Sequence, residues 1–227
     1  MLKRVAIVGG GSWATALVKL FSESRVNTSW LVRNKETADY ITANAHNPRY
    51  ISFAELNLDF IRVSSEPVKT LHDAGLIIFA VPSAYLKDTL KQIDKKLLAG
   101  KPLAVSIKSF VPGTGRTPSR FVAAHAGREA HEMMVVGGPC HAEEIANNKN
   151  TYLTFSGKDT KLVNELCAVL KCSYIRTIAN DDPVGIEFAA ILKNIIGVGT
   201  GIADGLYYGD NFQAVLISNA MREAGNF

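Results

Sequence analysis

Three small residues, Gly9, Gly11 and Ala14, form a G-x-G-x-x-A pattern directly after the apolar run Val5–Val8. The first glycine permits a tight turn, the second lets the backbone approach a pyrophosphate, and the alanine lets the next helix pack closely on the strand. Free N–H groups at the start of that helix would attract the anion. The pattern favours a dinucleotide-binding turn, with an ordinary glycine-rich turn as the alternative.

The end of a second predicted strand, over residues 29–32, bears on which dinucleotide is bound. A site that prefers NAD often has an acidic residue here for the ribose diol, but this sequence has Arg33 followed by Asn34. A guanidinium can hold a 2′-phosphate. We therefore predict NADP rather than NAD as the preferred cofactor, with a solvated surface arginine as the alternative.

Two further predicted strands end at the segments 81–83 (Val-Pro-Ser) and 107–109 (Ile-Lys-Ser). Open parallel sheets bind ligands beyond the carboxyl ends of their strands, so both segments are expected at one crevice. Pro82 could also simply end a strand. The Lys108 ammonium is expected to reach the cofactor or an anionic substrate, unless it is an ordinary solvated lysine.

A lone lysine, Lys193, interrupts an apolar stripe on a helix predicted over 187–196. The stripe is made by positions 186, 189, 190, 193, 196 and 197, which hold Ile, Ala, Ala, Lys, Ile and Gly. Desolvation there would lower the pKa of Lys193, as a general base near neutral pH requires. A snorkelling stem or a buried pair with a carboxylate is the structural alternative. The neighbouring Asn194 is either a substrate hydrogen-bonding group or a satisfied polar residue.

The segment 138–144 (Gly-Pro-Cys-His-Ala-Glu-Glu) follows another predicted strand and brings backbone amides to a helix start. His141 has no recognisable Ser or Asp partner nearby, which favours positioning or packing over catalysis. Cys140 could be a nucleophile at a helix N-terminus, where the thiolate is favoured. No other feature of covalent catalysis accompanies it.

The elements that must position these residues alternate along most of the chain. Strands are expected over 5–8, 29–32, 76–81, 103–107, 134–136, 152–155 and 174–177, and helices over 13–23, 84–98 and 160–170. Several strands are almost entirely apolar, as expected when helices cover both faces of a parallel sheet. We predict an α/β fold, a Rossmann-type doubly wound parallel sheet, in a dinucleotide-binding domain over residues 1–182.

The pattern changes at residues 180–183, where Asp182 can cap a helix whose first turn accepts Pro183. Residues 183–227 are predicted to form about two helices, which rarely make an independent core. We expect them to be the start of a second, all-α domain that this chain does not complete. Its uncovered apolar surface would invite association, a homodimer being one form of it.

Composition limits the classes of protein to which the chain can belong. Its 227 residues are 47% hydrophobic and 20% charged, with scattered basic residues and a net charge of +4. This predicts a globular protein with no nucleic-acid surface. Three cysteines without metal-ligand spacing predict reduced thiols in the cytoplasm and no metal site. The N-terminal apolar run is too short for a signal peptide, and the charges within 186–206 argue against a membrane span.

The sequence resembles the bacterial form of NAD(P)-dependent glycerol-3-phosphate dehydrogenase. Residues 9–17 are similar to that family's G-x-G-S-W-G-T-A-L opening, and residues 47–50 to its N-P-x-Y element. The segments 81–83, 108, 138–139 and 192–194 follow in the order of the family. The resemblance covers essentially the whole chain, but the family continues beyond Phe227 with further helices, an aspartate near the active lysine and an Arg-Asn pair for the substrate phosphate.

The resemblance implies a role for each matching residue. The cofactor contacts that it implies, beyond the glycine turn, are Ser12, Trp13, Arg33, Tyr50, Lys108 and Ala142, and the substrate contacts are Lys108, Gly138, Cys140 and Lys193. Lys193 would accept the proton when the alcohol of glycerol 3-phosphate is oxidised, while hydride passes to the nicotinamide of NAD or NADP. The implied cellular role is to supply glycerol phosphate for phospholipid synthesis.

Several residues depart from the family pattern, and two other functions remain open. Cys140 replaces a Ser or Thr, Ser109 replaces a glycine, and Gly197 and Gly199 replace alanines in a helix, where glycine costs about 1 kcal/mol. The first alternative function is another NADP-linked reductase, acting on a hydroxy or keto acid. The second is a nucleotide-binding fragment without catalysis.

Overall fold

The computed structural model describes residues 2–226, so Met1 and Phe227, the outer ends of the two predicted domains, lie outside the described residues. The described part contains one eight-stranded sheet with the strand order β3-β2-β1-β4-β5-β6-β7-β8. The strands are β1 (Val5–Val8), β2 (Thr28–Leu31), β3 (Ile61–Ser64), β4 (Leu76–Phe79), β5 (Leu103–Val105), β6 (Met134–Gly137), β7 (Thr151–Ser156) and β8 (Ile175–Asn180).

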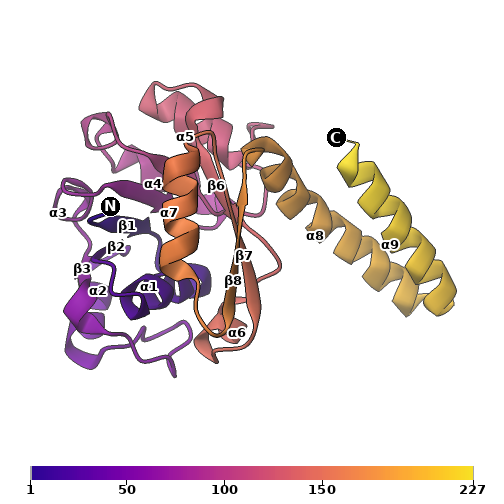
Figure 1. Cartoon of the computed structure of the whole chain (residues 1–227), viewed down its shortest axis with the longest axis horizontal. Coiled ribbons are helices and arrows are strands. Elements are labelled where there is room, and N and C mark those ends of the chain that lie inside the picture. Colours follow the sequence, from indigo (N-terminus) through magenta and orange to yellow (C-terminus); the bar gives the residue numbers. More distant parts are fainter. Residues whose placement is uncertain (1, 227) are drawn as a thin grey trace.

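Helices cover both faces of the sheet, and the last two project from one side of it as a pair (Figure 1). The helices are α1 (Ser12–Glu23), α2 (Lys35–Asn44), α3 (Pro67–Leu71), α4 (Ser83–Lys91), α5 (Pro118–Ala126), α6 (Ala142–Ala146), α7 (Thr160–Leu170), α8 (Pro183–Gly205) and α9 (Gly209–Gly225). The predicted α/β class, with a sheet between two helical layers followed by a helical part, is confirmed.

The two helical layers are explained by alternation along the central strands. Val5 and Ile7 of β1 join a hydrophobic cluster with α1, α2, α6 and α7. Ala6 and Val8 face the other way, into a cluster with α3, α4 and α5. All four side chains are fully buried. Because successive strand residues point to opposite faces, a strand apolar at every position must be covered on both sides. Ligands can therefore reach this sheet only at the ends of its strands.

The sheet is not parallel throughout, which corrects the prediction for its last two strands. Neighbours from β3 to β6 are parallel, but β7 runs antiparallel to β6, and β8 is parallel to β7. A parallel neighbour needs a crossover to the far end of the sheet. The connection over 138–150 contains only the short helix α6, and the chain then returns alongside β6. This loop therefore stays at the end of the sheet where β1, β4 and β5 also end.

Some elements differ from the sequence-based expectation. The edge strand β3 and the helices α2, α3 and α5 were not expected; Arg62 of β3 is exposed, so this strand lacks a continuous apolar run. The helix expected over 84–98 ends at Lys91, and a 3₁₀ turn (Lys95–Leu97) follows it, with the Asp94 carboxylate accepting a hydrogen bond from the Lys96 N–H.

Helix α8 begins as predicted but buries a different face. The Asp182 side chain caps it by accepting a hydrogen bond from the Gly185 N–H at 2.9 Å. The side chains buried in its first turns are those of Pro183, Glu187 and Ile191, whereas Lys193 is exposed. The predicted burial of Lys193 in an apolar stripe is therefore wrong.

The buried charge on α8 is Glu187, whose side chain is 1% exposed. Its carboxylate accepts hydrogen bonds from the Ser119 backbone N–H, at 2.8 Å, and from the Ser119 hydroxyl, in the first turn of α5. A carboxylate is favourable at a helix N-terminus, where N–H groups lack partners within the helix. This contact fixes the start of α8 to the sheet domain.

By length and composition alone, α8 is long and apolar enough to cross a membrane, and 17% of its most apolar window is buried. Both α8 and α9 expose large apolar side chains, as expected of an uncovered helical pair. These side chains are Val184, Ile195, Val198, Ile202, Phe212, Val215, Ile217 and Met221.

Candidate functional site

Four loops meet at the end of the sheet where β1, β4, β5 and β6 finish, which is the carboxyl end of these strands. They enclose a cleft of about 440 Å³, lined by residues 11–13, 80–83, 106–109 and 140–143. The glycine turn and the two segments predicted at the crevice, 81–83 and 107–109, contribute to this lining, and so does the segment after β6. The expectation that the strand ends converge on one crevice is therefore confirmed.

The glycine turn has the backbone features expected of a turn that binds a pyrophosphate. Gly9 has a φ of +135°, and a Cβ at this position would overlap the Ala80 carbonyl oxygen, so the turn needs glycine. A Cβ on Gly11, by contrast, would meet no atom within 4 Å. Gly11 also precedes α1, whose first turn receives no side-chain cap. Backbone N–H groups thus border open space, which fits a dinucleotide phosphate.

Asn47, a functional candidate that the sequence reasoning missed, holds this turn in place. Its side chain is 1% exposed, and its Nδ2 donates to the Gly10 carbonyl (3.1 Å) and to Thr15 Oγ1 (2.9 Å). Its Oδ1 accepts from the N–H groups of Arg49 and Tyr50. The residue type in the N-P-x-Y element was the available signal: a buried amide can satisfy two backbone segments at once.

We expect Asn47→Ala to lower the free energy of unfolding by about 2–3 kcal/mol, because it leaves buried polar groups without partners. NADPH affinity should fall as well, since the turn loses its brace. Urea unfolding and calorimetric titration measure the two effects. Asn44→Ala is the control, because the exposed Asn44 side chain donates only to the Tyr40 carbonyl within α2. Equal urea midpoints for both variants would contradict the assignment.

Lys108 is part of the cleft lining. Its Nζ donates to the Cys140 carbonyl at 3.2 Å and stands 5.1 Å from the centre of the Trp13 ring. Burial lowers the pKa of Lys108, and the nearby Lys193 charge lowers it further, while Cys140 opposes the shift. The desolvated amine that was expected at Lys193 is thus found at Lys108.

Lys193 and Asn194 approach the same place from α8. Asn194 Nδ2 donates to the Lys108 carbonyl at 2.9 Å, so this amide is a satisfied polar group that ties α8 to the loop after β5. The Lys193 side chain is exposed, yet its charge acts on both Lys108 and Cys140. The structure therefore places Lys193 close enough to Lys108 for the two charges to interact.

The loop after β6 closes the cleft with backbone and small side chains. Gly138 has a φ of +115°, and a Cβ there would come within 2.6 Å of the Tyr152 carbonyl oxygen. Cys140 is buried, and its Sγ donates to the Gly138 carbonyl. Burial raises the pKa of the Cys140 thiol, which disfavours the thiolate that a nucleophile would need. Ala142 is buried as the first residue of α6, and His141 is exposed.

The other predicted cofactor contacts lie outside the cleft lining. Arg33 is exposed just after β2, beside Asn34, whose side chain caps α2 by accepting from the Thr37 N–H. Tyr50 is 44% exposed in the loop that Asn47 joins to the glycine turn. Both side chains are free to meet a bound nucleotide.

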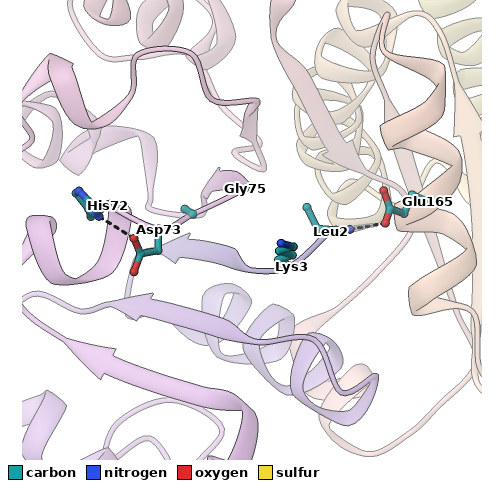
Figure 2. A pocket seen from close by; sticks show the side chains of 7 residues that line it. Leu2, Lys3, His72, Asp73, Gly75 and Glu165 are labelled. Carbon is teal, nitrogen blue, oxygen red and sulfur yellow. Dashed lines mark hydrogen bonds and ion pairs between the residues drawn. The ribbon is translucent and has the colours of Figure 1, made fainter.

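A second hollow lies at the opposite end of the strands, and neither the glycine turn nor Lys108 belongs to its lining. Figure 2 shows its lining, with His72 paired to Asp73 at 2.7 Å and the Leu2 N–H donating to Glu165. It lies at the start of β1 and β4, away from the glycine turn. Open α/β sheets bind ligands at the carboxyl ends of their strands, so the cleft at the glycine turn is the candidate site.

Comparison with known proteins agrees with this placement. Sequence models of the N-terminus and the C-terminus of NAD-dependent glycerol-3-phosphate dehydrogenase match residues 4–163 and 182–227. The glycerol-3-phosphate dehydrogenase (NAD(P)+) of Limosilactobacillus reuteri is 30% identical over 98% of this chain and 67% of its own length. That of Thiobacillus denitrificans is 34% identical over 97% of this chain and 66% of its own length.

Solved structures give the same result. A glycerol-3-phosphate dehydrogenase from Coxiella burnetii superposes with a TM-score of 0.83 and 27% identity, covering 99% of this chain and 68% of that one. A Plasmodium falciparum glycerol-3-phosphate dehydrogenase, at 22% identity and a TM-score of 0.86, shares the fold over 97% of this chain and 64% of its own. This chain spans about two thirds of the length of the relatives it matches. The chain belongs to the NAD-dependent glycerol-3-phosphate dehydrogenase family.

Proposed function

We propose that this protein is an oxidoreductase that interconverts sn-glycerol 3-phosphate and dihydroxyacetone phosphate with NAD(P). The observation that carries the proposal is that one cleft unites the glycine turn of α1 with the half-buried Lys108 amine. The first suits a dinucleotide, and the second suits a small phosphorylated substrate. In the cytoplasm, the reducing direction would supply glycerol phosphate for phospholipid synthesis. The helical part over 183–227 would contribute the substrate side of the site.

The chain's own residues divide the work of binding. Gly11 and the start of α1 hold the pyrophosphate, and Gly9 gives the turn its shape. Ser12, Trp13 and Ala142 line the same cleft, where they would contact the bound dinucleotide. The bound nicotinamide supplies or takes up the hydride.

Two lysines handle charge and proton at the substrate. The Lys108 ammonium attracts the anionic substrate, beside Gly138 and Cys140. Lys193 is exposed, so its assignment rests on its match to the family's lysine: it would accept the proton of the secondary hydroxyl in oxidation and return it to the carbonyl oxygen in reduction. Asn194 holds the Lys108 carbonyl, which fixes the spacing of the two lysines.

The test of this proposal is the loss of NAD(P)H absorbance when dihydroxyacetone phosphate is added. Dihydroxyacetone, which lacks the phosphate, and a keto acid serve as comparison substrates. Turnover of the phosphorylated substrate alone supports the proposal. Preference for the keto acid would favour another NADP-linked reductase, and calorimetric cofactor binding without turnover would favour a nucleotide-binding module.

The cofactor preference rests on Arg33. We expect Arg33→Asp to raise the Kd for NADPH by about 10–100-fold, because a charge-assisted contact with the 2′-phosphate is replaced by repulsion. The Kd for NADH should change little. Calorimetric titration measures both, with Lys87→Asp as a control of equal charge change at an exposed site on α4. Equal weakening of NADPH and NADH binding would remove the argument for NADP.

A further inference from the structure

A buried hydroxyl, that of Ser106, lies between two groups of the cleft wall. Ser106 follows β5 and is 4% exposed. Its Oγ accepts a hydrogen bond from Trp13 Nε1 at 2.7 Å and donates one to the Val136 carbonyl at 2.7 Å. The indole N–H can only donate and the carbonyl can only accept. The hydroxyl proton is therefore committed to the carbonyl, and the indole meets a lone pair in one orientation.

The indole that Ser106 orients carries Lys108 on its ring. Lys108 Nζ stands 5.1 Å from the ring centre, within the range in which a cation is attracted to an aromatic face. The same Nζ donates to the Cys140 carbonyl. The ammonium thus rests between a ring from α1 and a carbonyl from the loop after β6. Rotation of the ring would remove one of these two supports.

We propose that Ser106 is a positioning residue, a proposal that rests on the proposed function. Through its hydrogen bond to Trp13, Ser106 holds the aromatic ring against Lys108. The ring in turn keeps the Lys108 ammonium directed into the cleft. In this role Ser106 acts through Trp13, to which it is hydrogen-bonded, and not by direct contact with the reacting atoms. Its neighbour Lys108 is the group that would meet the phosphorylated substrate.

The charge balance around Lys108 sets the sign of the expected effect. Burial lowers the pKa of Lys108, Lys193 from α8 lowers it further, and Cys140 from the loop after β6 raises it. Two carboxylates belong to the adjoining α6: Glu143 lines the cleft, and Glu144 acts on Cys140. The Trp13 ring favours the charged amine. Loss of the oriented ring should therefore lower the pKa of Lys108 further.

The direct experiment is a ¹⁵N NMR titration of the Lys108 amine in the whole chain without ligands. In Ser106→Ala we expect the pKa of Lys108 to fall by about 0.5–1 unit, the size of a modest cation–π contact. Ser106→Thr keeps the hydroxyl and should restore the wild-type value. Ser22→Ala is the matched control, because Ser22 is fully buried on α1 and donates to the Lys19 carbonyl, away from the cleft.

A second pair of variants separates positioning from general damage. Trp13→Phe keeps a ring but has no N–H, so adding Ser106→Ala to it should cause no further shift of the Lys108 pKa. An unchanged Lys108 titration in folded Ser106→Ala, or an equal further shift in the Trp13→Phe background, would overturn the proposal. If Ser106→Ala does not fold, the comparison of Ser106→Thr with Ser106→Cys decides in the same way, since the thiol is a weaker acceptor.

Steady-state kinetics separate a failure of the positioning role from a failure of the proposed function. Lys108 is charged below its pKa, so a lower pKa should move the alkaline decline of kcat/KM for dihydroxyacetone phosphate to lower pH in Ser106→Ala. An alkaline decline that stays at the wild-type pH overturns the positioning role. If every protein, wild type included, lacks turnover while the NMR shift is present, the positioning role stands and the proposed function fails.

Discussion

Lys193→Met is expected to lower kcat for dihydroxyacetone phosphate by about 10²–10⁴-fold, the range typical of a lost general acid or base. Methionine keeps most of the side-chain volume but cannot carry a proton. The exposed Lys193 side chain acts on Lys108 from α8 and does not line the glycine turn. NADPH affinity should therefore stay close to the wild-type value. Steady-state kinetics and calorimetry measure the two quantities.

Two further variants control this result. Lys193→Arg keeps the charge but gives up its proton poorly, so kcat should remain low. Lys171→Met removes a charge from another exposed lysine and should leave kcat unchanged. A Lys193→Met protein with wild-type kcat would show that the proton comes from elsewhere, with Lys108 as the next amine to test.

Gly9→Ala is expected to reduce the free energy of unfolding by about 2–5 kcal/mol and to abolish measurable NADPH binding. The methyl group would overlap the Ala80 carbonyl oxygen, and the φ of +135° is strained for any residue with a Cβ. Relief of the overlap would move the turn away from the end of β4. Urea unfolding and calorimetric titration report the two consequences.

Variants at two other glycines separate the conformational cost of the substitution from its effect on NADPH binding. Gly127→Ala, at a φ of +69° with no atom near the added Cβ, should show the conformational cost alone, about 1 kcal/mol. Gly11→Ala has an ordinary φ of −82° and open space around the Cβ, so it should leave stability unchanged while weakening NADPH. Destabilisation by Gly11→Ala without loss of binding would contradict the pyrophosphate assignment.

Sequence reasoning located the cleft because its signals are local. The turn at Gly9 and Gly11, and the placement of Lys108 after a buried strand, depend on neighbours within a few residues. Strand direction is not local: the apolar run of β7 reads the same in either direction, and only the short connection through α6 makes it antiparallel. The edge strand β3 gave a weak signal because, of its four residues, only Ile61 is buried, and the exposed Arg62 interrupts the apolar run.

The buried face of α8 shows why part of the site could not be predicted. This helix is apolar on several sides, so periodicity alone allows more than one buried stripe. The choice is made by the α5 N-terminus, where the Ser119 N–H donates a hydrogen bond to the Glu187 carboxylate and Lys193 is left facing outward. Asn47 escaped notice for a similar reason: its partners at Gly10 and Thr15 are distant in sequence. The catalytic and binding roles of the site residues remain predictions.

Transfer of a labelled hydride tests the central claim most directly. NADPH deuterated at the transferred position of the nicotinamide is incubated with the protein and dihydroxyacetone phosphate, and the product is analysed by NMR. The account predicts glycerol 3-phosphate with deuterium on C2. Oxidation of the cofactor with no deuterium at that carbon, or no glycerol 3-phosphate at all, would contradict it.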